Sequence, residues 1–410
     1  MVPNSNQALA RVLFGVAEKG EIGGNLWDLA GLPSILPKGR YFLDAKLSAQ
    51  GATNAALGWT LGCYSFDRYK KKPKQEAELV WPTGADRRDV TRIADGIKLT
   101  RDLINTPADD LGPADLAAAA RQLGRMHKAH VSIIAGKDLL KKNYPSVHAV
   151  GRAAIQEPRL IDIAWGNVSA PKVTLIGKGV CFDSGGLDIK PASGMLKMKK
   201  DMGGAAQVLG LAHMIMDSAL AVRLRVLVPA VENAISGNAF HPLDVLDTRK
   251  GLTVEVGNTD AEGRLILSDA LAEAAREKPE MIIDFATLTG AARVALGTDL
   301  PALFCNDEQL AAALLSQGSH TADPFWRMPL WEGYKTHLSS NVADLSSTGS
   351  VPFGGAITAA LFLEHFVEPD IPWAHIDLMA FNNNTRPGRP EGGEAQGIRA
   401  VYAMLKKRYG

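Results

Sequence analysis

The chain has 410 residues, more than one hydrophobic core usually supports, so two domains are expected. Its 45 basic and 44 acidic residues leave a net charge of +1, which gives no global field that would attract nucleic acid or an anionic membrane. Cys63, Cys181 and Cys305 have no paired spacing, which argues against a disulfide scaffold or a cysteine-ligated zinc site.

Residues 1–84 are predicted to form a small N-terminal α/β domain, with a helix at 52–62 and a strand at 77–81. The basic run at 68–74 contains a tyrosine and could contact a phosphate backbone, but in a neutral chain we favour a solvated loop. Residues 1–20 lack the basic start and apolar run of a signal peptide. No apolar stretch approaches the ~20 residues of a membrane span. The sequence therefore predicts a cytoplasmic protein without a membrane partner, and nucleic acid is not an expected partner.

Residues 85–104 are predicted to form a linker helix, because apolar residues recur at about the helical period. Residues 105–410 then alternate between strand and helix patterns, which predicts a larger α/β domain with a mainly parallel central sheet covered by helices. Strands are expected at 131–135, 160–165, 173–176, 223–228, 253–256, 281–285 and 373–376, and the main helices at 205–216, 265–276 and 356–366. A long loop is expected at 382–396.

The most informative stretch is Asn-Thr-Asp-Ala-Glu-Gly-Arg-Leu at 258–265. If its backbone is extended, Asp260, Glu262 and Arg264 point into one space, because alternate residues of a strand share a face. Two acids that close repel unless a proton or a cation lies between them. Arg264 offsets one charge, which leaves room for a metal ion. A solvated surface turn, in which the arginine pairs with its own acids, is the alternative.

A second charged cluster begins with the Gly-rich segment 177–186 and continues through Lys190 to residues 199–204. This segment matches neither the Walker pattern nor the dinucleotide-binding pattern, and it carries Asp183 and Asp201 instead. Ligands of α/β sheets collect at the carboxyl ends of strands. Because Asp183 and Asp260 each follow a predicted strand, we expect them to meet there.

Four carboxylates without a histidine or cysteine form a set of oxygen ligands, which suits magnesium, manganese or zinc. They are too many for one ion and suit two ions that share bridging carboxylates, which in two-metal hydrolases lie roughly 3.5–4 Å apart. A lysine beside two cations can become a neutral ligand, and one that stays protonated can stabilise an oxyanion. Lys178 and Lys190 are candidates for these roles, and salt bridges to the acids are the alternative.

These motifs, with Lys-Lys-Asp-Met-Gly-Gly-Ala-Ala at 199–206, resemble the leucyl (cytosol) aminopeptidase family of dinuclear metallopeptidases. The resemblance covers residues from about 101 to the C-terminus. It implies that 105–410 is a catalytic metallopeptidase domain that releases apolar, leucine-like residues from the N-termini of peptides. It also implies two divalent ions per subunit (manganese or zinc, possibly magnesium or cobalt), a bicarbonate ion and a homo-hexamer.

The resemblance further implies a role for each matched residue. The tighter metal ion would be held by Lys178, Asp183, Asp201 and Glu262, and the exchangeable one by Asp183, Asp260 and Glu262. Lys190 would be the electrophile on the carbonyl oxygen, and Arg264, with backbone groups near Gly263 and Leu288, would hold the bicarbonate that serves as general base. Asn258 would contact the substrate backbone. The substrate side chain would lie against Met198, Thr287, Gly290 and Met379.

Two departures from the family pattern are visible. The N-terminal domain is shorter than is typical, and Asp377-Leu378-Met379-Ala380 replaces the usual Asp-hydrophobic-Ala-Gly, so Met379 stands where a small residue is normal. His375 falls in a predicted buried strand, where a core histidine is the favoured interpretation. Two other functions stay open as alternatives: a two-metal phosphoesterase, and a scaffold that binds DNA or a partner protein.

Overall fold

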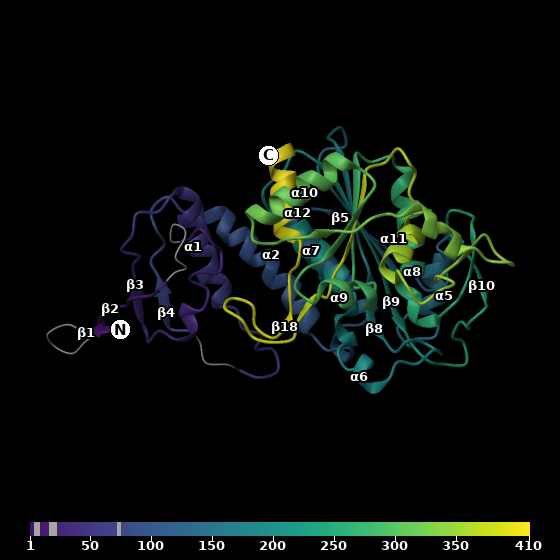
Figure 1. Ribbon diagram of the computed structural model, residues 1–410, viewed down its shortest axis with the longest axis horizontal. Coiled ribbons are helices and arrows are strands. Elements are labelled where there is room, and N and C mark those ends of the chain that lie inside the picture. The colour runs from purple at the N-terminus through teal and green to yellow at the C-terminus, as the bar shows by residue number, and fades with distance from the viewer. Residues whose placement is uncertain (4–8, 16–22, 72–74) are drawn as a thin grey trace. The chain divides into compact units, whose positions relative to one another are not determined.

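The computed structural model describes residues 1–3, 9–15, 23–71 and 75–410 (Figure 1). Two compact units are present, one of residues 1–94 with 386–389 and one of residues 95–385 with 390–410. Helix α2 (Arg87–Asn105) continues through the boundary between them. The sequence-based division at 84 and 104 stays a prediction. Residues 72–74 of the predicted basic loop, and parts of the segment searched for a signal peptide, lie outside the described residues.

The first unit is a small α/β unit built around helix α1 (Ala49–Gly62). The Ser48 side chain accepts a hydrogen bond from the Gly51 N–H, which caps the start of this helix. Gly58 allows the helix to approach its neighbour, because a Cβ there would lie 2.1 Å from the Leu26 carbonyl oxygen. Buried side chains from α1, from the short strands and from the preceding turns form its core: Leu29, Leu32, Ala55, Trp59, Ala77 and Leu79.

Four short strands and one 3₁₀ turn complete the described part of this unit. They are β1 (Val2–Pro3), β2 (Leu9–Arg11), η1 (Leu32–Ser34), β3 (Gly39–Tyr41) and β4 (Ala77–Leu79). Strands β3 and β4 are parallel, and β1 and β2 are antiparallel.

The second unit is organised around a nine-stranded sheet, in the order β14-β13-β16-β12-β7-β9-β6-β5, with β8 paired to β9. Its strands are β5 (His130–Ala135), β6 (Arg159–Trp165), β7 (Lys172–Gly177), β8 (Gly179–Asp183), β9 (Arg223–Asn233), β12 (Met281–Ala286), β13 (Ala302–Cys305), β14 (Trp326–Arg327) and β16 (Trp373–Asp377). The central pairs β16-β12-β7-β9 are parallel, and antiparallel pairs lie towards the edges. The prediction of a mainly parallel central sheet is confirmed.

Helices cover both faces of this sheet (Figure 1). One face is covered by α3 (Pro113–His127), α7 (Gly203–Asp217), α10 (Glu308–His320) and α12 (Ile398–Tyr409). The other is covered by α5 (Pro145–Gly151), α8 (Glu262–Arg276), α9 (Gly290–Leu296) and α11 (Gly355–Glu364). All six residues of β12 are buried, as expected of a parallel strand covered on both sides.

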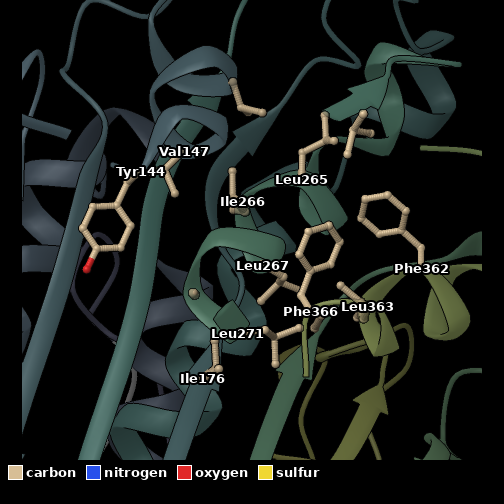
Figure 2. Close-up of a cluster of buried hydrophobic side chains, with 14 of the residues drawn as sticks. Tyr144, Val147, Ile176, Leu265, Ile266, Leu267, Leu271, Phe362, Leu363 and Phe366 are labelled. Atoms are coloured by element: carbon tan, nitrogen blue, oxygen red, sulfur yellow. The ribbon is translucent and has the colours of Figure 1, made fainter. Parts of the chain in front are cut away.

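The core beneath α8 and α11 is continuous (Figure 2). Leu267 and Leu271 of α8 lie beside Phe366, which follows α11, and Ile176 of the sheet lies nearby. This packing fixes the start of α8 relative to the central strands, which matters because Glu262 is the first residue of that helix.

The remaining elements are short. They are η2 (Ala108–Asp110), α4 (Asp138–Lys141), α6 (Ala192–Met195), η3 (Met198–Met202), β10 (Val245–Asp247), β11 (Thr253–Glu255), η4 (Thr259–Ala261), η5 (Glu332–Leu338), β15 (Leu345–Ser346), β17 (Phe381–Asn382) and β18 (Gly392–Gly393).

Two expectations about the strands near the motifs are wrong. Residues 179–183 form strand β8, where the Gly-rich sequence suggested a loop. Strand β11 belongs to a separate sheet with β10 and β15, so Asp260 does not follow a strand of the central sheet. The carboxylates still meet, because strand β9 is long enough to pair with β7 along its first half and with β8 along its second.

Candidate metal centre and active site

Three elements bring the acidic residues of the two motifs together. Asp183 is the last residue of β8, Asp201 lies in the turn η3, and Asp260 lies in η4, directly before α8. Gly204 allows the start of α7 to approach the sheet, because a Cβ there would lie 2.0 Å from the Phe285 carbonyl oxygen. This close approach holds η3 beside the ends of the central strands.

The extended backbone expected for 258–265 is wrong. Residues Thr259–Ala261 form a 3₁₀ turn and Glu262 begins α8, so a tight turn brings Asp260 and Glu262 to the same space. The Asn258 side chain accepts a hydrogen bond from the Asp260 N–H at 2.7 Å and caps this turn. Arg264 does not pair with these acids, since its Nη1 donates to the Ser347 carbonyl at 2.7 Å. A solvated surface turn is excluded, because Glu262 is 1% exposed and Arg264 is 8% exposed.

Oxygens from Asp183, Asp260 and Glu262 all lie within 4.8 Å of one another. Two lysines lie between the acids. Lys178 Nζ is 2.7 Å from Asp201 Oδ2 and 2.9 Å from Glu262 Oε1. Lys190 Nζ is 2.8 Å from Asp183 Oδ2 and also contacts Asp260 Oδ1.

Burial and mutual repulsion perturb the acids strongly. Burial, and then the charge of Asp183, raise the pKa of Glu262 to about 8, although Lys178 opposes them. The same two causes raise the pKa of Asp260 to about 6, against Lys190. Burial acts in the same direction on Asp201, but Lys178 and then Lys200 outweigh it and lower the pKa of Asp201 to about 2. Clustered acids with perturbed pKa values are typical of functional sites.

The donor set fits hard or borderline divalent ions. Asp201 Oδ2 and Glu262 Oε1 are buried and touch Lys178, but within the described residues neither accepts a hydrogen bond of good geometry. Carboxylate oxygens in this state are ready to accept a cation, and oxygen ligands match manganese, magnesium or zinc in a carboxylate site.

A surrounding set of hydrogen bonds orients Asp183. Its Oδ1 accepts from Asn233 Nδ2 at 2.8 Å and from the Gly185 N–H at 2.9 Å, which leaves Oδ2 directed at Lys190. Asn233 Nδ2 also donates to the Thr259 carbonyl at 3.1 Å, which links β9 to η4. The sequence did not single out Asn233, because one asparagine at the end of a strand carries no motif.

Arg264 fits the anion role suggested by the resemblance. It is buried, and its Nε has no hydrogen-bond acceptor among the described residues. Burial lowers its pKa to about 10, although Glu262 and Asp377 oppose the shift. The Leu288 N–H donates to Asp377 Oδ1 at 3.0 Å, so this backbone group already has a partner. Gly263 leaves room for Lys178, whose Cε would lie 2.5 Å from a Cβ at that position.

The residues expected around the substrate side chain are only partly brought together. Thr287 Oγ1 donates to Asp201 Oδ1 at 2.8 Å, so it adjoins the acidic cluster. Met198 starts η3 and is 8% exposed, and Met379 is 9% exposed. Gly290 is exposed at the start of α9.

The departure at 379–380 has a backbone consequence. Ala380 has φ of 56°, in the left-handed region where glycine is favoured, and the family pattern has glycine there. Its Cβ would lie 2.4 Å from a Cβ on Gly203, so glycine is required at 203.

His375 lies in the core, as the sequence suggested. It is fully buried, and its Nδ1 is 2.5 Å from Asp284 Oδ1. Trp373 Nε1 donates to the other Asp284 oxygen at 2.7 Å.

Comparisons with known proteins agree with this geometry. Residues 98–402 match the model of the cytosol aminopeptidase family, catalytic domain, and residues 1–82 match that of the M17 aminopeptidase N-terminal domain. A probable cytosol aminopeptidase of Rhizobium meliloti is 37% identical over 436 aligned residues, which cover 100% of this chain and 87% of that protein.

Solved structures are also similar. The crystal structure of cytosol aminopeptidase from Coxiella burnetii has a TM-score of 0.96 and 52% identity, covering 100% of this chain and 89% of that one. The bottromycin maturation enzyme BotP in complex with Mn has a TM-score of 0.87 and 34% identity, covering 93% and 87% of the two chains. The similarity also covers the N-terminal residues, which lie before the stretch on which the resemblance in the sequence rests.

Proposed function

The chain belongs to the cytosol aminopeptidase family and is a metal-dependent aminopeptidase, and from this premise we propose that it releases apolar, leucine-like residues from the N-termini of peptides. The observation that carries the proposal is the convergence of Asp183, Asp260 and Glu262 within 4.8 Å, with Asp201 joined to the group through Lys178. A cluster of this composition supports the division of ligands between two ions that the resemblance implies.

In this proposal Lys178, Asp183, Asp201 and Glu262 would hold the tighter ion. Asp183, Asp260 and Glu262 would hold the exchangeable ion, so Asp183 and Glu262 would serve as ligands of both. Two such ions would activate a water molecule and polarise the carbonyl of the first peptide bond. We propose manganese or zinc as the natural metal, with magnesium or cobalt as substitutes, and the Mn bound by BotP is consistent with this choice.

Lys190 is positioned to act on the substrate. Lys190 is half-buried, and its ammonium contacts the proposed metal ligands Asp183 and Asp260. From this position it can donate a hydrogen bond to the substrate carbonyl oxygen as that oxygen gains negative charge. Burial acts against the charged form, but Asp183 and Asp260 raise the pKa of Lys190, which keeps its ammonium protonated near neutral pH.

Arg264 would hold a bicarbonate ion that takes the proton of the attacking water. The buried Nε without an acceptor supports this role. The Leu288 N–H is hydrogen-bonded to Asp377. Arg264 and the Gly263 backbone would therefore make most of the contacts to the bicarbonate ion.

Asn258 would contact the substrate backbone through the part of its amide that does not cap η4. Met198, Thr287, Gly290 and Met379 would line the space for the substrate side chain. We further propose a cytoplasmic homo-hexamer. Within the part of the chain that the structure describes, no helix has both the length and the apolar composition needed to cross a membrane.

The test is to quantify bound metal and to measure hydrolysis of a panel of aminoacyl amides beside a phosphate ester. Turnover of the amides that depends on bound metal supports the proposal. Turnover of the phosphate ester alone would favour the phosphoesterase alternative.

A further inference from the structure

Asn233 joins the two segments that carry Asp183 and Asp260. It is the last residue of β9 and is fully buried. Its NH₂ group donates one hydrogen bond to Asp183 Oδ1 at 2.8 Å and another to the Thr259 carbonyl at 3.1 Å. The first acceptor belongs to the end of β8, and the second belongs to η4, the turn that contains Asp260. One side chain therefore spans the gap between these two acids.

The other end of the same amide is left without a partner. Within the described residues, the buried Oδ1 of Asn233 accepts no hydrogen bond. A buried acceptor in this state destabilises the folded protein, and a leucine of similar shape would not bring this cost. Reversing the amide would place its carbonyl against two other oxygens, which would repel it. The amide is therefore oriented by Asp183 and Thr259, and its presence calls for a role beyond packing.

The backbone of Asn233 holds the same end of β8. Its carbonyl accepts from the Ser184 N–H at 3.2 Å and from Ser184 Oγ at 2.7 Å. The following loop passes close by, because a Cβ on Gly186 would lie 2.9 Å from Asn233 Oδ1. Side chain and backbone together fix Asp183 relative to β9.

The turn η4 is less well covered than the other parts of the site. The Asp260 side chain is 32% exposed, whereas that of Glu262 is 1% exposed. Glu262 is also supported by helix α8, which it begins. The position of Asp260 relative to Asp183 thus depends on the bonds of the turn itself, and the bond from Asn233 to the Thr259 carbonyl is one that reaches across to Asp183.

We propose that Asn233 is a positioning residue for the exchangeable metal ion, because its amide sets the spacing between Asp183 and the turn that carries Asp260. The inference rests on the division of ligands in the proposed function and adds a residue outside the ligand set. Asp183 and Asp260 are two of the three side-chain ligands proposed for the exchangeable ion. Of the four proposed for the tighter ion, only Asp183 is bonded to the side chain of Asn233 within the described residues.

The test titrates metal-free native protein and metal-free Asn233→Leu with manganese(II) alone. The electron paramagnetic resonance signal of the free ion counts the ions that are bound. Removal of a group that orients metal ligands typically lowers metal affinity 10- to 100-fold, so we expect a loss of about this size for the exchangeable ion. The tighter ion should lose less than about 5-fold, because its other three ligands have separate supports. A purely structural role would weaken both ions alike.

Activity supplies a second readout. Turnover of a leucyl amide by Asn233→Leu should be low at limiting manganese and should return as manganese is raised, because every proposed ligand is still present. Asn233→Ala removes the same amide without filling its space, so it covers the case in which leucine does not fit beside Gly186. It should weaken the exchangeable ion in the same way.

Asn306→Leu is the matched control. The Asn306 amide also joins two segments, since its Nδ2 donates to the Ile371 carbonyl at 3.0 Å and its Oδ1 accepts from the Trp373 N–H at 2.7 Å. Trp373 is the first residue of β16, so this link lies at the opposite edge of the sheet from the carboxyl ends of the parallel strands. Both manganese affinities should stay at their native values.

Two ions bound by the native protein, with both affinities unchanged or equally weakened in the folded Asn233 variants, would overturn this inference and leave the metal-dependent aminopeptidase standing. Failure of the native protein to bind a second manganese ion would overturn the inference together with the proposed two-ion site.

Discussion

Lys190 Nζ lies 2.8 Å from Oδ2 of Asp183, although the loop between them carries no regular structure. Asn233 and the Gly185 N–H occupy the other oxygen of Asp183, so Oδ2 is the one that faces the centre of the site. Positive side chains thus approach the acidic cluster from two sides, Lys178 from the break between β7 and β8 and Lys190 from the following loop. Acidic and basic groups packed this closely with little solvent suit chemistry on a polarised carbonyl.

Lys190→Ala should lower kcat and leave bound metal unchanged. If Lys190 is the main oxyanion donor, its removal should raise the activation free energy by ~3–4 kcal/mol. Arg264→Ala should have a smaller effect, because a water molecule can take the place of the anion. Steady-state kinetics with parallel metal analysis measures both. Loss of a metal ion from Lys190→Ala would show that Lys190 is a ligand.

Metal binding should release protons at pH 7. Burial and the charge of Asp183 raise the pKa of Glu262 from 4.5 to about 8, so the folded, chelator-treated protein retains a proton there. Such a group contributes stability below pH 4.5 and loses that contribution as pH rises towards 8, so the chelated protein should become less stable across this window. Titration calorimetry in buffers of different ionisation enthalpy counts the released protons. A binding enthalpy that does not change with the buffer would contradict the raised pKa.

Asp269→Asn should lower the free energy of unfolding by about 3 kcal/mol. Asp269 is fully buried and accepts from the backbone N–H groups of Ser146, Val147 and Arg249 at 2.9, 3.1 and 2.8 Å. An asparagine would turn an NH₂ group towards one of these donors. Denaturant unfolding measures the loss, and Asp247→Asn on the exposed side of β10 is the control, expected within about 0.5 kcal/mol of the native protein. Equal effects of the two substitutions would show that Asp269 does not cap α5.

Met379→Ala should shift preference towards bulkier apolar N-termini. Met379 is 9% exposed and stands where the family pattern has alanine, and the proposal places its side chain in the substrate pocket. Pocket volume discriminates by ~1–3 kcal/mol per methylene, so kcat/KM for leucyl and phenylalanyl substrates should rise relative to alanyl. An unchanged ranking would mean that Met198 and Thr287 set the selectivity.

The parts of the fold that the sequence predicted are those in which a local pattern and the tertiary structure agree. The strand predicted at 281–285 is wholly buried in β12, and the helix predicted at 265–276 matches α8. Strand β8 was missed because it is short and lies within a Gly-rich segment, and it forms a strand because β9 extends past β7 to pair with it.

The site was predicted for residues that carry a motif and missed for those that do not. Asp183 was found because it follows a predicted strand, and Glu262 was found through its spacing to Asp260. The backbone conformation predicted around Asp260 was wrong. A 3₁₀ turn before α8, and not an extended strand, brings Asp260 beside Glu262. Asn233 and Lys200 resemble ordinary polar residues in the sequence. Among the described residues, only their burial and a polar side-chain atom without a hydrogen-bond partner distinguish them.

The measurement that tests the central claim most directly is the cleavage of one peptide and of its N-acetylated form, followed by mass spectrometry. It is made with the native protein and with Asp183→Asn, each at known metal content. Asp183 is 2% exposed and is the proposed bridge between the ions, so its substitution should abolish cleavage. We expect metal-loaded native protein to release one residue at a time from the free N-terminus and to leave the acetylated peptide intact. Cleavage by verified metal-free protein, or equal cleavage of the two peptides, would contradict the assignment of this site to a metal-dependent aminopeptidase.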